Sequence, residues 1–227
     1  MKKRIKNILY STKFIVILGL IIVPFVSFAF ITISPESPLY TSISRIAWVH
    51  NLWLNTFIWA LIIMLSIVWL TYRLVETSPL SSKAKKIIIW WQFLNILLVF
   101  IGCLMFPAKQ DVEMVKLINY LHDYVTAIGW VLYGIGLIVY SILLRRKDKF
   151  LGFLGLGIMS FIIFSSIFFI MRVVAPTSYV GASAVSEVYI INSLYIFLVF
   201  MYVAQEYTAR LGCKKNLLEE MDSKNGE

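Results

Sequence analysis

Apolar residues fill six long stretches of this chain, and short polar segments separate them. Each stretch is long enough to cross the ~30 Å hydrocarbon core of a bilayer, which takes about 20 helical residues. The spans are placed at about Phe14–Thr32, Ala47–Tyr72, Ile87–Phe106, Tyr124–Leu144, Phe150–Val173 and Val188–Ala204. The pattern predicts an all-α, polytopic transmembrane bundle of six helices.

Basic residues gather in every second connection. Seventeen of the 21 Lys and Arg lie in the N-terminal segment, the second-to-third connection, the fourth-to-fifth connection and the C-terminal tail. The second-to-third connection is expected to hold Arg73, Lys83, Lys85 and Lys86. Because short cytoplasmic loops are enriched in Lys and Arg, both termini are predicted to be cytoplasmic and the protein to lie in the cell membrane.

The charge pattern also divides the chain into three parts. Residues 1–13 are a basic cytoplasmic N-terminus, residues 14–206 are the transmembrane domain, and residues 207–227 are a cytoplasmic tail. The end of the tail, from Leu211 to Glu227, mixes charges of both signs and holds no aromatic residue, so we expect it to be solvated and partly disordered.

Composition supports a lipid environment. The chain is 60% hydrophobic and 15% charged, whereas a soluble domain is about 45–50% apolar and about 25% charged. The net charge of +9 follows from the cytoplasmic connections, so no nucleic-acid partner is needed to explain it. The same basic connections can attract anionic phospholipids on the cytoplasmic side.

The first span allows two interpretations. A basic start, an apolar run and the small residues of Ser27-Phe28-Ala29 resemble a signal peptide with a cleavage site. The apolar run is long for a signal peptide and contains Pro24, which a membrane helix tolerates as a kink. We therefore expect the first helix to be retained.

Two outer segments also have a recognisable pattern. The loop from Ile33 to Arg45 is rich in Ser, Pro and Thr and is expected to be turn-rich. In the segment Pro107–Asp123, apolar residues alternate with charges, which predicts a short interfacial helix.

Candidate site residues gather at the outer ends of the spans, because no Asp, Glu, Lys, Arg or His lies near the middle of any span. They are His50, Asn51, Asn55, His122, Asp123, Arg172 and Glu187. In one interpretation they form an outward-facing pocket for a lipid headgroup, a small ligand or a partner, with Arg172 suited to a phosphate.

Metal or acid–base chemistry at the same place would use His50, His122, Asp123 and Glu187. The simpler interpretation is that helix ends tolerate polar groups and that carboxylates favour helix N-termini. The sequence has no zinc-type Cys spacing, phosphate loop, haem or dinucleotide motif, so no cofactor, metal or catalytic residue is assigned.

Glycines predict close helix contacts. Gly129 and Gly136 share a face of the fourth span, and Gly152 and Gly155 share a face of the fifth. Small residues let membrane helices approach closely, and the short connection makes these two spans neighbours.

Three short motifs resemble those of the DRAM/Frag-type six-helix membrane proteins and their bacterial relatives. They are Ser42-Ile43-Ser44-Arg45-Ile46-Ala47 before Asn51 and Asn55, His122-Asp123 at the start of the fourth span, and Ala184-Val185-Ser186-Glu187 before the sixth. These relatives often carry an acidic residue where Arg45 stands. The resemblance implies a multi-pass protein linked to membrane trafficking or lipid-anchor handling, and supplies no catalytic residues.

Three functions therefore stay open. The first is a non-enzymatic membrane protein that binds a lipid or a protein partner. The second is the membrane subunit of a transport, export or immunity system. The third is an intramembrane metal-dependent enzyme, which requires His50, His122, Asp123 and Glu187 to converge.

Overall fold

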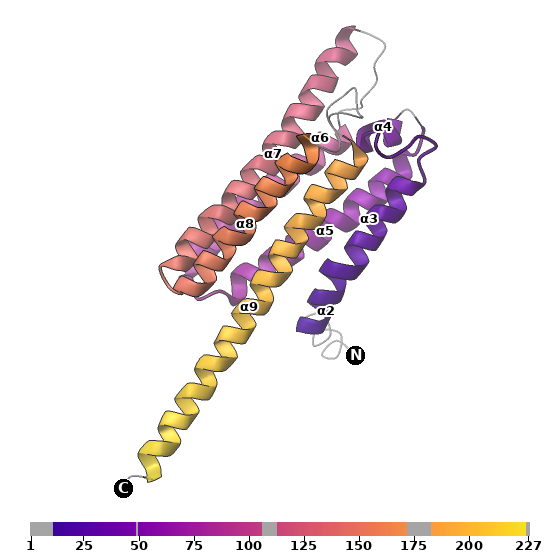
Figure 1. Cartoon of the computed structure of the whole chain (residues 1–227). Helices are drawn as coiled ribbons and strands as arrows, with labels where there is room; N and C mark the ends of the chain where they lie inside the picture. The colour runs from indigo at the N-terminus through magenta and orange to yellow at the C-terminus, as the bar shows by residue number, and fades with distance from the viewer. Residues whose placement is uncertain (1–10, 49, 106–112, 172–182, 226–227) are drawn as a thin grey trace, which may run out of the picture.

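Every structural element in the described part of the chain is helical. The computed structural model describes residues 11–48, 50–105, 113–171 and 183–225. Six helices there are long and apolar enough to cross a membrane, which confirms the predicted six-span, all-α architecture. They lie side by side in one bundle (Figure 1). The chain is thus a multi-pass membrane protein.

The elements follow one another along the chain without a strand in the described ranges. They are α2 (Thr12–Ile17), the π-helical η1 (Leu18–Ile22), α3 (Val23–Thr32), α4 (Ile43–Trp48), α5 (Trp53–Thr77), α6 (Ser82–Met105), α7 (Glu113–Arg145), α8 (Lys149–Phe169) and α9 (Ala184–Asn225). We call the end with the α5–α6 and α7–α8 connections the basic end. The opposite end, with residues 33–42 and the start of α9, is the loop end.

The first span consists of α2, η1 and α3 in continuous succession. Pro24 has no N–H, and its ring conflicts with the carbonyl one turn earlier. The helix adapts through η1, where the Val23 N–H bonds to Leu18 O, five residues back. The span packs as part of the bundle, since a Cβ on Gly19 would overlap the Val199 side chain of α9.

The second span begins later than the sequence predicts. A short helix, α4, precedes it, and the transmembrane helix α5 starts only at Trp53. The break contains Asn51, whose φ of 56° is left-handed, a conformation that a right-handed helix does not contain. Asn tolerates this conformation better than most residues. The predicted span start at Ala47 is therefore wrong, and Asn51 does not share a helical face with Asn55.

The second-to-third connection is shorter than predicted. It spans only residues 78–81, because α5 continues to Thr77 and α6 starts at Ser82. Arg73 consequently lies inside α5 and is buried, while Lys83, Lys85 and Lys86 stand in the first turns of α6. The aliphatic part of a long basic side chain can cover apolar surface, so Lys and Arg can lie within a helix near its end. The hydropathy pattern therefore predicts an end for α5 that is too early and a start for α6 that is too late.

Two helices extend beyond their predicted spans. α7 begins at Glu113, so the part of the predicted interfacial helix that the structure describes is continuous with the fourth span. α9 continues as a helix to Asn225, past the end of the bundle (Figure 1), over residues for which the sequence predicts a solvated, partly disordered tail. Leu, Lys, Glu and Met, which are good helix formers, make up most of this tail and favour a helix there.

The middle of the bundle is formed by α5 and α9. α9 contacts the first span, α5 and α8, and α5 contacts the first span, α6 and α9. In the membrane-crossing windows, 61% of α9 residues are buried, compared with 28% of α8 residues. α8 is therefore the span with the most surface left for lipid.

Glycines allow the close helix contacts that the sequence predicts. A Cβ on Gly129 would lie 3.1 Å from the Asn95 carbonyl oxygen of α6, and one on Gly152 would overlap the Arg145 backbone of α7. Gly152 and Gly155 of α8 thus pack on α7, whereas Gly129 and Gly136 of α7 pack on α6. Hydrogen bonds strengthen the second contact, as Trp91 Nε1 donates to Leu132 O (3.1 Å).

Candidate functional site

The loop end joins segments that are far apart in the sequence. The Ala184 N–H donates to Thr41 O (2.6 Å), and the Val185 N–H donates to Pro38 O (3.4 Å). The first N–H groups of a helix have no partner within it. Carbonyls of the loop between α3 and α4 therefore satisfy the start of α9 and fix that loop on the bundle.

Glu187 completes this junction from the other direction. Its Oε2 accepts the Ile43 N–H at the start of α4 (3.0 Å), across 144 residues of sequence. Beside it, the Ser186 N–H donates to Ser183 Oγ (3.2 Å), while the Ser183 N–H donates to Ser186 Oγ (3.0 Å). Glu187 therefore holds the start of α4 to α9, with a carboxylate at the positive end of a helix.

His50 contacts Glu36, a residue that no sequence pattern marks as part of a site. Its Nε2 lies 3.5 Å from Glu36 Oε1, with the two side chains 14% and 34% exposed. The contact ties the α4–α5 connection to the loop between α3 and α4. It is an ion pair only when the imidazole is protonated.

The other predicted site residues do not join these contacts in the described ranges. Asn51 and Asn55 are exposed. His122 and Asp123 belong to the backbone of α7, but their side chains lie outside the described set, as does all of Arg172. Within the described residues, no three His, Cys, Asp or Glu side chains come together as a metal site would need.

Replacing Glu187 tests whether the loop end is a structural junction. We expect Glu187→Ala to lower the free energy of unfolding by about 1 kcal/mol, because the α4 cap is lost. Glu187→Gln keeps an acceptor oxygen and should cost less, and the exposed Asn55→Ala is the control. Thermal unfolding in mild detergent measures the difference. Equal midpoints for Glu187→Ala and Asn55→Ala would contradict the role assigned to Glu187.

A second polar region, which the sequence did not predict, lies between α5, α7 and α9. Its members are four tyrosines buried in the bundle, Tyr133, Tyr140, Tyr195 and Tyr202. Tyr133 Oη lies 2.7 Å from Thr71 Oγ1, and Tyr195 Oη donates to Ile63 O (2.6 Å). Tyr133 and Tyr140 are seven residues apart, as are Tyr195 and Tyr202, and this spacing is the sequence pattern that could have identified them. Tyrosine is also common at membrane interfaces, so the pattern did not point to a buried cluster.

The same region continues to the basic end. Gln205 Nε2 donates to Tyr140 Oη, and Gln205 Oε1 accepts from Thr77 Oγ1 (3.2 Å). Arg73, 8% exposed, donates to Tyr202 Oη (3.3 Å) and lies 5.8 Å from the centre of that ring. These contacts join α5, α7 and α9 through hydrogen bonds between buried side chains.

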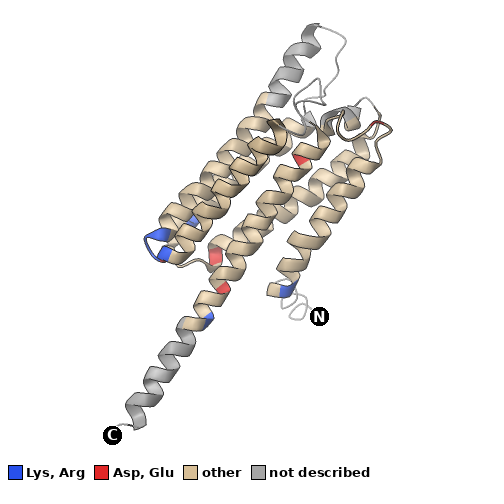
Figure 2. Cartoon of the chain, in the orientation of Figure 1, with Lys and Arg blue, Asp and Glu red and all other residues tan. Residues whose placement is uncertain are grey.

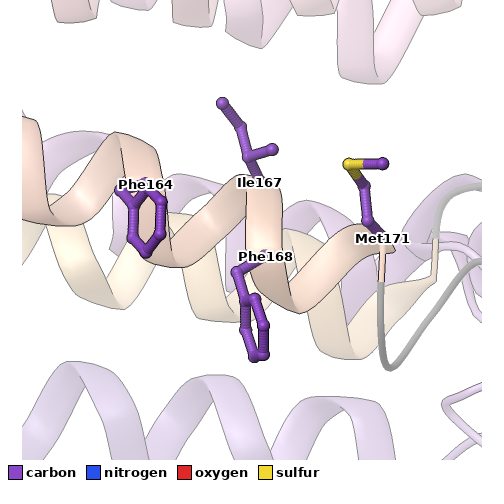
Figure 3. Close-up of a pocket in the computed structure, with 4 residues that line it drawn as sticks. All are labelled: Phe164, Ile167, Phe168 and Met171. Carbon is purple, nitrogen blue, oxygen red and sulfur yellow. The ribbon is translucent and has the colours of Figure 1, made fainter.

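The surface of α8 is hollowed in two places. The larger hollow has a volume of about 690 Å³ and lies between α8 and α9; we call it the α8–α9 groove. It is lined by Phe150, Phe153, Leu154, Gly157, Ile158, Phe161, Ile196 and Phe200. A second hollow of about 490 Å³ lies at the end of α8 and is lined by Phe164, Ile167, Phe168 and Met171, which follows α8 (Figure 3). The groove is lined by side chains of two helices, α8 and α9.

Comparisons with protein-family models, with curated proteins and with solved structures find no match for this chain. The resemblance to DRAM/Frag-type proteins therefore stays a prediction from three short motifs.

Proposed function

We propose that this chain is a non-enzymatic multi-pass membrane protein that binds a phospholipid, with one acyl chain in the α8–α9 groove. The observation that carries the proposal is the groove itself, an apolar hollow of about 690 Å³ on the least buried span. In a bilayer such a hollow must be filled, because a void deprives its walls of van der Waals contacts.

Gly157 is the reason that the groove exists. A Cβ built on Gly157 would meet no atom within 4 Å, so the floor of the groove lacks a side chain. Phe153 and Phe161 stand one turn before and after it and are 59% and 69% exposed. Large rings on either side of a glycine make a slot along the helix.

The shape of the groove favours an acyl chain over another helix. Membrane helices pack closely where several small residues share a face. Gly152 and Gly155, the small residues that would serve this purpose on α8, already pack on α7. The remaining face presents exposed phenylalanines, which keep a second backbone at a distance but admit a single hydrocarbon chain.

Filling the groove should remove lipid binding without unfolding the bundle. We expect an equimolar mixture of dioleoyl phosphatidylglycerol and dioleoyl phosphatidylcholine to raise the unfolding temperature of the delipidated wild type in detergent. At about 100 times the Kd, a ligand stabilises by about 2.7 kcal/mol, or roughly 5–10 °C at this size. Gly157→Leu should abolish the rise, because its side chain occupies the groove.

Gly134→Leu is the matched control. Gly134 lies on α7, outside the groove, and a Cβ there would also meet no atom within 4 Å. This variant should keep the full lipid-dependent rise. A Gly157→Leu protein that is stabilised by lipid as much as the wild type would reject the proposal.

A ligand or partner at the loop end is a second candidate. What supports it is the pairing of a mostly buried His50 with Glu36, beside the exposed amides of Asn51 and Asn55. If this surface binds a partner, His50→Ala and Asn55→Ala should weaken that binding and leave phospholipid binding unchanged. Transport and metal-dependent catalysis stay predictions from the sequence.

A further inference from the structure

We propose that the phospholipid of the α8–α9 groove is anionic and that its headgroup is held by the basic turn between α7 and α8. This inference rests on the proposed function and adds the headgroup class and the bilayer leaflet. It joins two features that lie next to each other in the fold, the apolar groove and a cluster of exposed cations.

The basic turn has a large positive charge at the end of the groove. Arg145, Arg146, Lys147 and Lys149 are all exposed or partly exposed, and Figure 2 shows a blue cluster at the α7–α8 connection. Asp148 is the single acid of the turn. Its Oδ1 accepts the Leu151 N–H (3.0 Å) as the cap of α8, so this carboxylate is directed to the helix.

Groove and turn are continuous. Phe150, which lines the groove, directly follows Lys149, and the Arg145 guanidinium carbon lies 5.3 Å from the centre of the Phe153 ring, which also lines the groove. Arg145 therefore links the cationic turn to the apolar wall. A phosphate bound at the turn has an apolar path for its chain immediately beside it.

The length of the groove matches one leaflet. From Phe150 to Phe161 an α-helix rises about 16 Å, which is about half of the ~30 Å hydrocarbon core. A chain that starts at the basic turn would thus reach the middle of the bilayer. The turn belongs to the side predicted to be cytoplasmic, where anionic lipids attract Lys and Arg.

Separate titrations with dioleoyl phosphatidylglycerol and dioleoyl phosphatidylcholine test the headgroup, using the thermal shift of the detergent-purified protein to obtain each Kd. The wild type should prefer phosphatidylglycerol. In the double variant Arg146→Gln/Lys147→Gln, the ratio of the two Kd values should fall by roughly 25-fold. The reason is that each cation near an anionic headgroup strengthens the affinity about fivefold. In about 0.5 M salt the wild-type preference should also fall, since screening shortens the reach of exposed charges.

The control is Lys83→Gln/Lys86→Gln, which removes two cations from the start of α6, outside the groove. It should keep the wild-type preference. An equal loss in both double variants would show a general effect of net charge and overturn the inference. Equal affinity of the wild type for the two lipids, with binding still lost in Gly157→Leu, would also overturn it while leaving the proposed function intact. No lipid-dependent shift in the wild type would reject both.

Discussion

Replacing Gly152 by leucine is expected to destabilise the bundle by about 3 kcal/mol, the cost of overpacking a close helix contact. Even a Cβ at this position would overlap the backbone of Arg145, and a backbone cannot turn aside as a side chain can. The loss corresponds to roughly 6–12 °C in the unfolding temperature of a chain of this size. Thermal unfolding in mild detergent gives the value.

Gly157→Leu and Gly134→Leu are the controls for this effect. Gly157 lies on the same helix, and a side chain at either position meets open space. Both variants should therefore unfold within about 1–2 °C of the wild type, because a surface substitution changes the stability by only about 0.5 kcal/mol. If Gly152→Leu unfolds at the same temperature as these two, α7 and α8 do not pack as the structure shows.

The second large effect is expected from Tyr140→Phe. The Tyr140 hydroxyl accepts from Gln205 Nε2, and Gln205 is only 3% exposed. Without the hydroxyl, a buried donor loses its partner in a region that water does not reach. Interhelical hydrogen bonds in membranes contribute about 0.6 kcal/mol on average, and an orphaned buried donor adds a penalty. We therefore expect a loss of about 1–2 kcal/mol.

Tyr72→Phe is the matched control, since Tyr72 is 40% exposed on α5. It removes the same hydroxyl from the surface and should leave the unfolding temperature unchanged. The double variant Tyr140→Phe/Gln205→Leu removes both partners and should recover part of the loss. A Tyr140→Phe protein as stable as Tyr72→Phe would mean that the tyrosine contacts do not hold α7 to α9.

The sequence predicts the architecture because the bilayer imposes it. Six apolar stretches of sufficient length and an uneven distribution of Lys and Arg are visible in the chain without any knowledge of its contacts. Helix ends are harder to predict, because hydropathy does not indicate whether a polar residue is exposed to solvent or buried. Arg73 marked a connection in the sequence, yet it lies buried in α5 against Tyr202.

The candidate site was predicted only in part for a related reason. The position of Glu187 at a helix N-terminus was visible in the sequence, but its partner Ile43 is 144 residues away. The groove gave no polar signal at all. The groove depends on which glycines of α8 pack on α7 and which one faces outward. Gly152 packs on Arg145, whereas a side chain at Gly157 meets open space, but the sequence alone does not distinguish the two glycines.

Native mass spectrometry of protein extracted directly from membranes tests the central proposal, a phospholipid held in the α8–α9 groove. The measured quantity is the number of phospholipids retained after loosely bound lipid has been stripped. We expect one retained phospholipid on the wild type and on Gly134→Leu, and none on Gly157→Leu. The same retained phospholipid on all three proteins, or on none, would contradict the proposal.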